Sequence, residues 1–302
     1  MIRIKVPATS ANVGVGFDCL GLAVSYYSTI SFETSDARLI ITGSPKEFQN
    51  ADNLVYQAFV KGCNFLDKPV PNVKINIEGD VPVARGLGSS SVCVVAGLKA
   101  ASVWYGDAIS TDQLLVLATE MEGHPDNVTP AILGGLCVSF LDDQNLPQVI
   151  QYHVSNQLHF VAMIPDYEVS THAARKVLPT TLSYADAIHQ VSHCAAMTKA
   201  LELGDRHMIH EACDDRMHEP YRAKLIPDYS QAKNISEQFG GTMYISGSGS
   251  TMMAITANEN DADKIVENAQ AAFPKWTVRK MAVDSTGVTS EVSERGKVLH
   301  RW

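Results

Sequence analysis

Residues 81–91 read Val-Pro-Val-Ala-Arg-Gly-Leu-Gly-Ser-Ser-Ser and run directly into a predicted helix over 90–105. Gly86 and Gly88 allow a positive φ and a close approach of the backbone to a ligand. The first helical turn adds serine hydroxyls, unpaired N–H groups and the positive end of the helix dipole, which together suit a phosphate. A simple Gly/Ser helix cap with Arg85 on the surface explains the same residues equally well.

The charge balance restricts what this glycine turn (81–91) could bind. Among 302 residues, 24 Lys and Arg stand against 33 Asp and Glu, which gives a net charge of −9. An acidic chain is a poor partner for nucleic acid or an anionic membrane, so any anion must be held locally. Hydrophobic residues make up 45% and charged residues 19%, as in an ordinary globular protein of one large or two domains.

The spacing of the cysteines and the length of the apolar runs indicate where in the cell the protein is located. The six cysteines form no CxxC pair and no metal-ligand spacing, so a disulfide framework or zinc knuckle is not expected. No apolar run approaches the roughly 20 residues of a membrane span, and residues 1–6 alternate as a strand does rather than as a signal peptide. We therefore expect a cytoplasmic protein that binds neither membrane nor nucleic acid.

Alternating and β-branched runs predict strands, while caps and apolar spacing predict helices. Strands are expected over 2–6, 27–33, 38–42, 73–77, 158–164 and 277–283 and in an interrupted run over 243–256, and helices over 55–65, 90–105, 114–122, 187–203 and 261–273. This mixed order predicts the α+β class rather than strict βαβ alternation. We place a domain boundary near residue 155, which divides the chain into 1–155 and 156–302.

The familiar nucleotide-binding motifs are missing from the sequence. It contains no GxxxxGK[ST], no complete GxGxxG, and no HRDxxxxN or DFG, which disfavours P-loop, Rossmann and protein-kinase sites. Two further glycine-rich stretches remain, at 7–18 and 245–251. Either one alone would be interpreted as a turn.

Together, 7–18, 82–91 and 246–251 resemble in order and spacing the three motifs of the GHMP small-molecule kinases. The longer patterns PATSANxGxGFDCLG at 7–21, PxARGLGSSS at 82–91, EGHPDN at 122–127 and SGSGST at 246–251 look like the homoserine kinases of that family, nearly from end to end. The departures are small and local: Val13 and Val15 stand where leucine and proline are common, and Ser248 and Ser250 where alanine and proline are common.

The resemblance implies a fold and a nucleotide site. The amino domain would be of the ribosomal protein S5 domain 2 type, the carboxyl domain would be ferredoxin-like, and the active site would lie between them. ATP would place its phosphates on the glycine turn. The ATP-binding residues implied are Asn53, Pro82, Val83, Ala84, Arg85, Gly86, Leu87, Gly88, Ser89, Ser90, Ser91 and Val92, with Asn53 near the adenine unless it only caps the 55–65 helix.

Phosphoryl transfer needs charge neutralisation on the transferred group, so Mg²⁺ is expected as the metal. By the family pattern its protein ligands would be the Ser90 hydroxyl and the Glu122 carboxylate. Taken alone, Ser90 is interpreted as an N-cap and Glu122 as a solvated helix end. Glu120 is a nearby competitor for the metal.

The acceptor implied is L-homoserine, whose hydroxyl would be phosphorylated by ATP to give O-phospho-L-homoserine in threonine biosynthesis. Its carboxylate calls for arginine and its ammonium for an acid. The substrate residues implied are Arg175 and Arg222 for the carboxylate, Asp18 and Asp126 for the ammonium, Asn12 and Asn127 for the polar end, and Gly247 in the pocket wall. The residues closest to the chemistry would be Asn12, Glu122, Asp126 and Asn127.

Several alternatives stay open at this point. A carboxylate paired with an ammonium is a weak base, so Asp126 is interpreted as a positioning group rather than a general base. His124, in a turn before Pro125, is interpreted as structural. Other acceptors (mevalonate or a sugar) and a non-catalytic ligand-binding relative remain as competing functions, and the oligomeric state is open, with a homodimer as one option.

Overall fold

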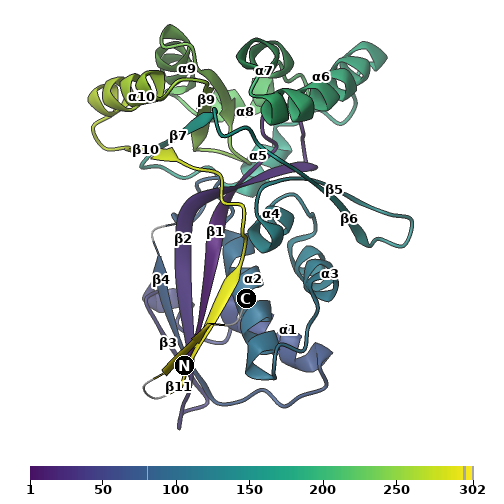
Figure 1. The fold of residues 1–302 in the computed structure, drawn as a ribbon, viewed down its shortest axis with the longest axis vertical. Coiled ribbons are helices and arrows are strands. Elements are labelled where there is room, and N and C mark those ends of the chain that lie inside the picture. The colour runs from purple at the N-terminus through teal and green to yellow at the C-terminus, as the bar shows by residue number, and fades with distance from the viewer. Residues whose placement is uncertain (80, 295–296, 301–302) are drawn as a thin grey trace.

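The computed structural model describes residues 1–79, 81–294 and 297–300, which form two lobes with a sheet each (Figure 1). The first sheet is built on two long strands, β1 (Ile2–Ala11) and β2 (Leu20–Thr34), that pair antiparallel. Its order is β12-β11-β1-β2-β4-β3, with a β5–β6 hairpin attached to β2. The further bounds are β3 (Leu39–Thr42), β4 (Val73–Gly79), β5 (Leu136–Leu141), β6 (Pro147–Tyr152), β11 (Thr289–Glu294) and β12 (Lys297–His300).

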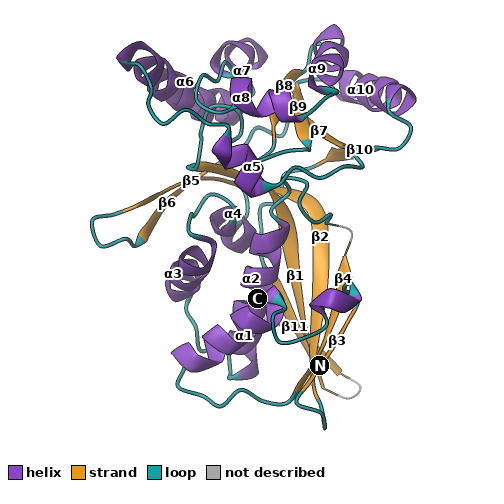
Figure 2. Cartoon of the chain, turned by 180° about the vertical axis from the view of Figure 1, so that it is seen from behind, coloured by secondary structure: helices purple, strands orange, loops and turns teal. Residues whose placement is uncertain are grey.

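Helices cover one face of this sheet, as both views show (Figures 1 and 2). They are α1 (Leu54–Phe65), α2 (Ser89–Trp104), α3 (Thr111–Glu122) and α4 (Val128–Leu133), and a short 3₁₀ turn, Lys46–Phe48, precedes them. Alternate strand residues such as Ile4 and Phe32 are fully buried against Phe59 and Leu98 of the helices. This apolar core fixes the direction of α2 and so aims its N-terminus at the other lobe.

The second lobe holds a four-stranded antiparallel sheet in the order β10-β7-β9-β8. Its strands are β7 (His159–Ile164), β8 (Thr242–Ile245), β9 (Met252–Thr256) and β10 (Thr277–Met281), and its helices are α5 (Thr171–Lys176), α6 (Tyr184–Leu203), α7 (Arg206–Ala212), α8 (Glu219–Arg222), α9 (Tyr229–Gln238) and α10 (Glu259–Ala272), with a 3₁₀ turn at Ala223–Leu225. In chain order this is a β-α-β-β-α-β pattern, so the ferredoxin-like expectation is confirmed.

Both faces of the second sheet are buried, because helices pack on each side. Phe160 and Met253 face α6 and α7, whereas Val161 and Ala254 face α9 and α10. The sequence therefore shows continuous apolar runs here instead of the alternation of a half-exposed strand.

The expected elements are present, with shifted ends. The helix expected from 90 begins at Ser89, and the strand expected over 27–33 extends back to Leu20. The α+β class is confirmed, and the change from one sheet to the other falls between β6 and β7, near residue 155. The end of the expected second unit, 156–302, behaves differently, because Thr289–Glu294 leaves the second lobe and pairs with β1. Within the described residues, no helix is long and apolar enough to cross a membrane.

Candidate functional site

A cavity of about 350 Å³ opens where the glycine-bearing loops of both lobes meet. The first lobe contributes the end of β1 and the loop after it, the glycine turn, and the end of α3 with the segment that follows. The second lobe contributes α5, α8 and the loop between β8 and β9. The lining residues are Ala11, Asn12, Asp18, Ala84, Gly86, Gly88, Ser89, Ser90, Ser91, Met121, Glu122, His124, Asp126, Asn127, Thr171, Arg175, Arg222, Gly247 and Ser248.

The glycine turn closes against the β8–β9 loop and strand β1 at positions where a side chain does not fit. Gly86 has φ +77°, and a Cβ there would lie 2.1 Å from the carbonyl oxygen of Ser246. Gly88 is the N-cap of α2 with φ +67°, and its Cβ would lie 2.1 Å from Oγ1 of Thr9. Only glycine adopts this backbone without strain, so the N–H groups at the start of α2 stay open to the cavity. Such N–H groups at the positive end of a helix dipole are suited to an anion.

Beside this helix start, two serines hold the last residue of α3. Ser90 Oγ donates to Glu122 Oε1 at 2.5 Å, and Ser91 Oγ donates to Oε2 at 3.0 Å. Helix α3 ends at Glu122 because Gly123 takes a left-handed conformation (φ +85°). The competing Glu120 instead pairs with Lys61 at 2.8 Å on the surface and does not line the cavity.

This pair fits the donor chemistry of a magnesium site. A hydroxyl and a carboxylate oxygen within 2.5 Å of one another are hard oxygen donors at a place where an anion would bind. Mg²⁺ usually takes one or two protein oxygens and keeps the remaining positions for water and phosphate. Ser90 and Glu122 supply that number.

A buried arginine lies at another wall of the cavity. Arg222 is 3% exposed, and its Nε and Nη1 donate to the carbonyl oxygens of Ala174 (3.2 Å) and Gly247 (2.8 Å). No carboxylate of the described part of the chain lies within ion-pair distance of it. Burial lowers the pKa of Arg222 to about 10, which still leaves it charged at neutral pH. A buried cation whose partners are neutral is well suited to an anionic ligand.

The second arginine is paired differently from the expectation. Arg175 makes a two-pronged contact with Asp18, with both N–O distances 3.0 Å, and this pair raises the pKa of Arg175. The family resemblance predicts that Arg175 and Asp18 bind opposite charges of one ligand, whereas here they neutralise each other. The aromatic ring of Phe17 lies under both guanidinium groups, 5.8 Å from Arg175 and 5.1 Å from Arg222.

The remaining acid of the cavity is Asp126, which is 2% exposed and hydrogen-bonded to Nδ1 of His124. That hydrogen bond raises the pKa of His124. Asn127 accepts from the Thr9 hydroxyl at 2.7 Å, and Asn12 donates to the Gly247 carbonyl at 3.0 Å. The two asparagines thus brace the loops and leave Asp126 as the buried carboxylate of the site.

Most predicted residues meet in this cavity, and a few do not line it. Asn53 is buried, accepts from the Val55 N–H and donates to the Phe48 carbonyl, so its side chain caps α1. Arg85 reaches the second lobe, where it contacts the Pro165 and Asp166 carbonyls (3.1 Å each) and Glu168 (3.2 Å). Also outside the lining are Pro82, Val83, Leu87 and Val92.

Family models match in both lobes. The GHMP kinase N-terminal domain model matches residues 53–135, and the GHMP kinase C-terminal model matches residues 197–275. The chain belongs to the GHMP kinase family. Homoserine kinase of Clostridium botulinum (strain 657 / Type Ba4) is 41% identical over 290 residues, 95% of this chain and 97% of that protein. Homoserine kinase of Clostridium beijerinckii is 40% identical over 296 residues, 96% and 98% of the two chains.

Solved structures agree. A homoserine kinase from Cytophaga hutchinsonii superimposes with a TM-score of 0.87 at 28% identity and 96% coverage of both chains. A mevalonate kinase matches with a TM-score of 0.70 at 14% identity, covering 94% of this chain and 99% of that one, and this shows the shared fold alone.

Sequence reasoning misses several residues of this GHMP kinase site. From the sequence alone, His124 is interpreted as structural. In the structure it lines the cavity and is hydrogen-bonded to Asp126. Its position two residues from a predicted site carboxylate is the available signal. Ser248 belongs to the glycine-rich stretch 246–251, which is the signal for it. Thr171, whose hydroxyl lies 3.5 Å from that of Ser248, gives no signal because single hydroxyl residues are common in loops.

Proposed function

We propose that this GHMP kinase is an ATP-dependent homoserine kinase that phosphorylates the side-chain hydroxyl of L-homoserine to give O-phospho-L-homoserine in threonine biosynthesis. The observation that carries the proposal is the buried Arg222, which lacks an acidic partner among the described residues and shares one cavity with the buried Asp126 and the start of α2. A buried cation, a buried carboxylate and the N-terminus of a helix in one cavity suit a zwitterionic acceptor together with ATP. The names of the two Clostridium relatives agree with this acceptor.

The first lobe binds the nucleotide in this proposal. The N–H groups at the start of α2 hold phosphate oxygens, because the left-handed Gly88 opens that helix end toward the cavity. Ser90 and Glu122 would hold Mg²⁺, which when bound neutralises charge on the transferred phosphoryl group. Arg85 acts through its contacts to the second lobe, so it positions the glycine turn against that lobe.

The second end of the cavity binds the amino acid. Arg222 binds the substrate carboxylate, since its charge is buried and its direct partners are backbone carbonyls. Asp126 accepts the ammonium, and Asp18 joins it when the Arg175–Asp18 pair opens to share the zwitterion. Asn12 and Asn127 keep the loops at the reacting end in place through their bonds to Gly247 and Thr9.

The catalytic strategy we propose is positioning without a dedicated base. Asp126 already has two partners, His124 and the substrate ammonium, and a carboxylate so engaged is a weak base. Phosphoryl transfer demands little proton abstraction before the transition state, because that state is loose and its charge lies mainly on the phosphoryl oxygens. Alignment of the acceptor hydroxyl with the phosphate is therefore the main contribution of this end.

The alternative acceptors differ from homoserine in the charges that they carry. Mevalonate has a carboxylate and no ammonium, and a sugar has neither, so both leave Asp126 buried without a cationic partner from the ligand. A non-catalytic relative has no use for the Ser90–Glu122 pair.

The deciding experiment is a coupled ADP-release assay of the purified protein with ATP and Mg²⁺ against homoserine, threonine, serine, mevalonate and galactose. We expect turnover with homoserine above all other acceptors. A preference for mevalonate or galactose would show that this compound, and not homoserine, is the acceptor. No turnover with any of the five compounds would favour the non-catalytic function. We further propose a cytoplasmic location. We also propose that the protein does not bind nucleic acid, and a mobility-shift assay at moderate salt tests this second proposal.

A further inference from the structure

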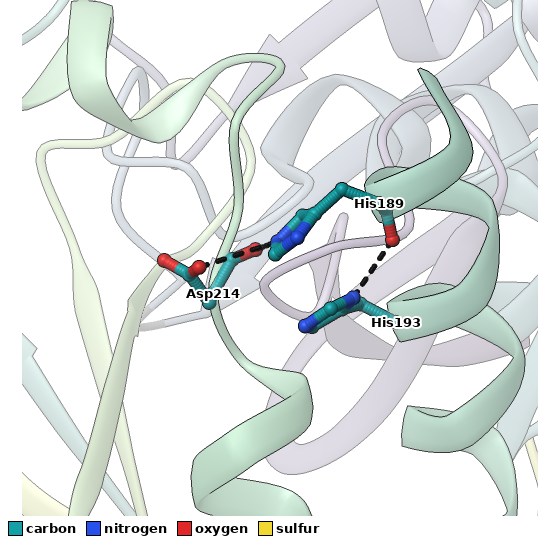
Figure 3. Close-up of side chains that lie close together, drawn as sticks. All are labelled: His189, His193 and Asp214. Atoms are coloured by element: carbon teal, nitrogen blue, oxygen red, sulfur yellow. Dashed lines mark hydrogen bonds and ion pairs between the residues drawn. The ribbon is translucent and has the colours of Figure 1, made fainter. Parts of the chain in front are cut away.

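A second cluster of metal-type ligands lies in the second lobe, outside the cavity described above. His189 and His193 are one helical turn apart on α6, and Asp214 lies in the segment between α7 and α8 (Figure 3). One ligand atom from each residue lies within 4.8 Å of the others. Two histidines at i and i+4 on one helix face are a spacing that zinc sites use.

The hydrogen bonds of His193 prepare its ring for a metal. Its Nδ1 is 2.8 Å from the backbone carbonyl of His189, and because a carbonyl only accepts, Nδ1 carries the proton. The lone pair is then on Nε2, at the far end of the ring (Figure 3). Metal-binding histidines commonly donate their other ring N–H to a carbonyl in this way, which fixes the tautomer and the ring orientation.

The other two ligands already face each other. His189 Nε2 is 2.7 Å from the backbone carbonyl of Asp214 and 3.2 Å from its Oδ2. The rings of His189 and His193 are stacked with centroids 3.5 Å apart, so both present an edge toward the Asp214 side. The Asp214 side chain is 64% exposed, which leaves an open route from solvent.

We propose that His189, His193 and Asp214 bind a late first-row divalent cation, with Zn²⁺ as the reference ion. Two imidazoles and one carboxylate are a typical three-ligand set, with water in the fourth position. Tetrahedral zinc with ligands at about 2.1 Å needs ligand atoms about 3.4 Å apart, so separations within 4.8 Å must close by at most about 1.4 Å. Rotation of Asp214 can bring its carboxylate to the cation, and the cation takes the Nε2 lone pair of His189 once the ring proton has moved from Nε2 to Nδ1, so that the imidazole stays neutral.

One positive neighbour must be accommodated. Arg216 Nε is 3.9 Å from Asp214 Oδ2, but Arg216 also contacts Asp186 at 3.4 Å and can keep that partner when Asp214 turns to a metal. The overall net charge of −9 also favours cations. This site differs in chemistry from Ser90 and Glu122, since imidazole nitrogen favours zinc, copper and nickel over magnesium.

A cation here would link α6 to the segment that carries the start of α8. Asp215, next to Asp214, accepts from Gln190 of α6 at 2.6 Å and from the N–H groups of His218 and Glu219 at 2.8 and 2.7 Å. Helix α8 in turn holds Arg222. The metal would therefore add a second link between α6 and the segment before α8, next to the hydrogen bond from Gln190 to Asp215.

The test measures direct binding of Zn²⁺ to the full chain by calorimetric titration. The melting temperature is measured with and without the ion. We expect one Zn²⁺ per chain at this site and a higher melting temperature when it is bound, because the ion binds the folded state. His193→Ala and Asp214→Asn should each weaken binding by at least roughly tenfold, since even loss of an outer-shell partner has an effect of that size. Asp214→Asn keeps the backbone contact to His189, so it remains informative if His193→Ala folds poorly.

Two controls separate this site from other zinc-binding groups. His207→Ala removes an exposed histidine of α7 that is not in the cluster and should leave the affinity unchanged. Cys194→Ser, next to His193 in sequence, should also retain binding. The proposal is overturned if the wild-type protein takes up no Zn²⁺, or if Cys194→Ser abolishes binding while His193→Ala and Asp214→Asn do not reduce it.

Discussion

Ser90, in the first turn of α2, donates its hydroxyl to Glu122, the last residue of α3, across 2.5 Å. The two residues are 32 positions apart in sequence, and their meeting fixes the end of one helix against the start of another. Glu122 is thereby held at the positive end of the α2 dipole, where a carboxylate is stabilised. A hydroxyl and a carboxylate placed together next to the N-terminus of a helix are the type of oxygen ligands that a divalent cation takes.

Glu122→Gln tests this pair. The amide keeps the shape and one acceptor oxygen but loses the negative charge that would bind the metal. We expect kcat to fall by at least roughly two orders of magnitude, because the charge acts on the transition state, while ATP binding weakens less. Steady-state kinetics with homoserine and ATP measure both quantities.

Glu120→Gln is the matched control for that change. Glu120 is two residues away on the same helix and pairs with Lys61 on the surface, where a single ion pair contributes little. Its substitution should leave kcat near that of the wild type. Normal turnover by Glu122→Gln together with slow turnover by Glu120→Gln would assign the ligand to Glu120 instead.

Gly88→Ala tests the close packing of the glycine turn. The new Cβ would lie 2.1 Å from Thr9 Oγ1 in a backbone with φ +67°. The left-handed conformation alone costs roughly 1–2 kcal/mol for a residue with a Cβ, and the contact must also be relieved by moving the helix start. We expect a lower melting temperature and a raised KM for ATP.

Gly106→Ala provides the comparison at the other end of the same helix. Gly106 also has a positive φ (+86°), but a Cβ at this position would meet nothing within 4 Å, so only the backbone strain applies. The melting temperature of this variant should fall while its KM for ATP stays unchanged. Equal effects of both substitutions on the KM would mean that the Gly88 contact is not what shapes the phosphate site.

Much of the fold could be predicted from local sequence signals. The Ser110–Gln113 capping box and the left-handed Gly123 mark the two ends of α3, and both features are present. The return of Thr289–Glu294 to β1 could not be predicted, because strand pairing across the whole chain is decided by tertiary packing and leaves no local pattern.

The candidate site was likewise predictable only in part. The motifs identify which residues meet, since Asn12, Glu122, Asp126 and Arg222 do line one cavity. They do not reveal how those residues pair. Arg175 binds Asp18, and Arg85 reaches across to the Pro165 carbonyl, because each long side chain pairs with a group that the opposite lobe places within its reach. Sequence spacing carries no information about that choice.

The contact between His124 and Asp126 predicts a pH dependence. The hydrogen bond raises the pKa of His124 above its ordinary value of 6.5. The stabilisation from this pair is therefore fully present below about pH 6.5 and is lost as the pH rises through the raised pKa. Over the same interval Asp126 loses its protonated neighbour and becomes a better partner for the substrate ammonium, so the KM for homoserine should fall.

His124→Gln is expected to flatten both profiles. Glutamine can still donate a hydrogen bond to Asp126 but does not titrate, so the melting temperature and the KM should change less as the pH rises through the pKa of His124. His172→Gln, at an exposed histidine on α5, is the control and should keep the wild-type profiles. An unaltered pH profile in His124→Gln would show that another group controls substrate binding.

The clamp proposed for the substrate carboxylate is tested at Arg222. Arg222→Ala should raise the KM for homoserine by an amount equivalent to about 2–4 kcal/mol, because a buried charge pair is lost, and leave the KM for ATP nearly unchanged. Arg222→Lys should restore binding only in part, since a point charge lacks the two-pronged geometry. Arg175→Ala should have a smaller effect, because Arg175 is 41% exposed and already neutralised by Asp18.

Changing the substrate tests the same contact from the other side and avoids the effect of Arg222→Ala on the Ala174 and Gly247 carbonyls. Homoserine methyl ester keeps the ammonium and the hydroxyl but has no carboxylate charge. If Arg222 binds that charge, the ester should lose about as much kcat/KM with the wild-type enzyme as homoserine loses with Arg222→Ala, and the variant should discriminate little between the two acceptors, because the two changes delete one interaction. Equal turnover of ester and acid by the wild type, or full discrimination by the variant, would place the carboxylate elsewhere and remove the main physical argument for an amino-acid acceptor.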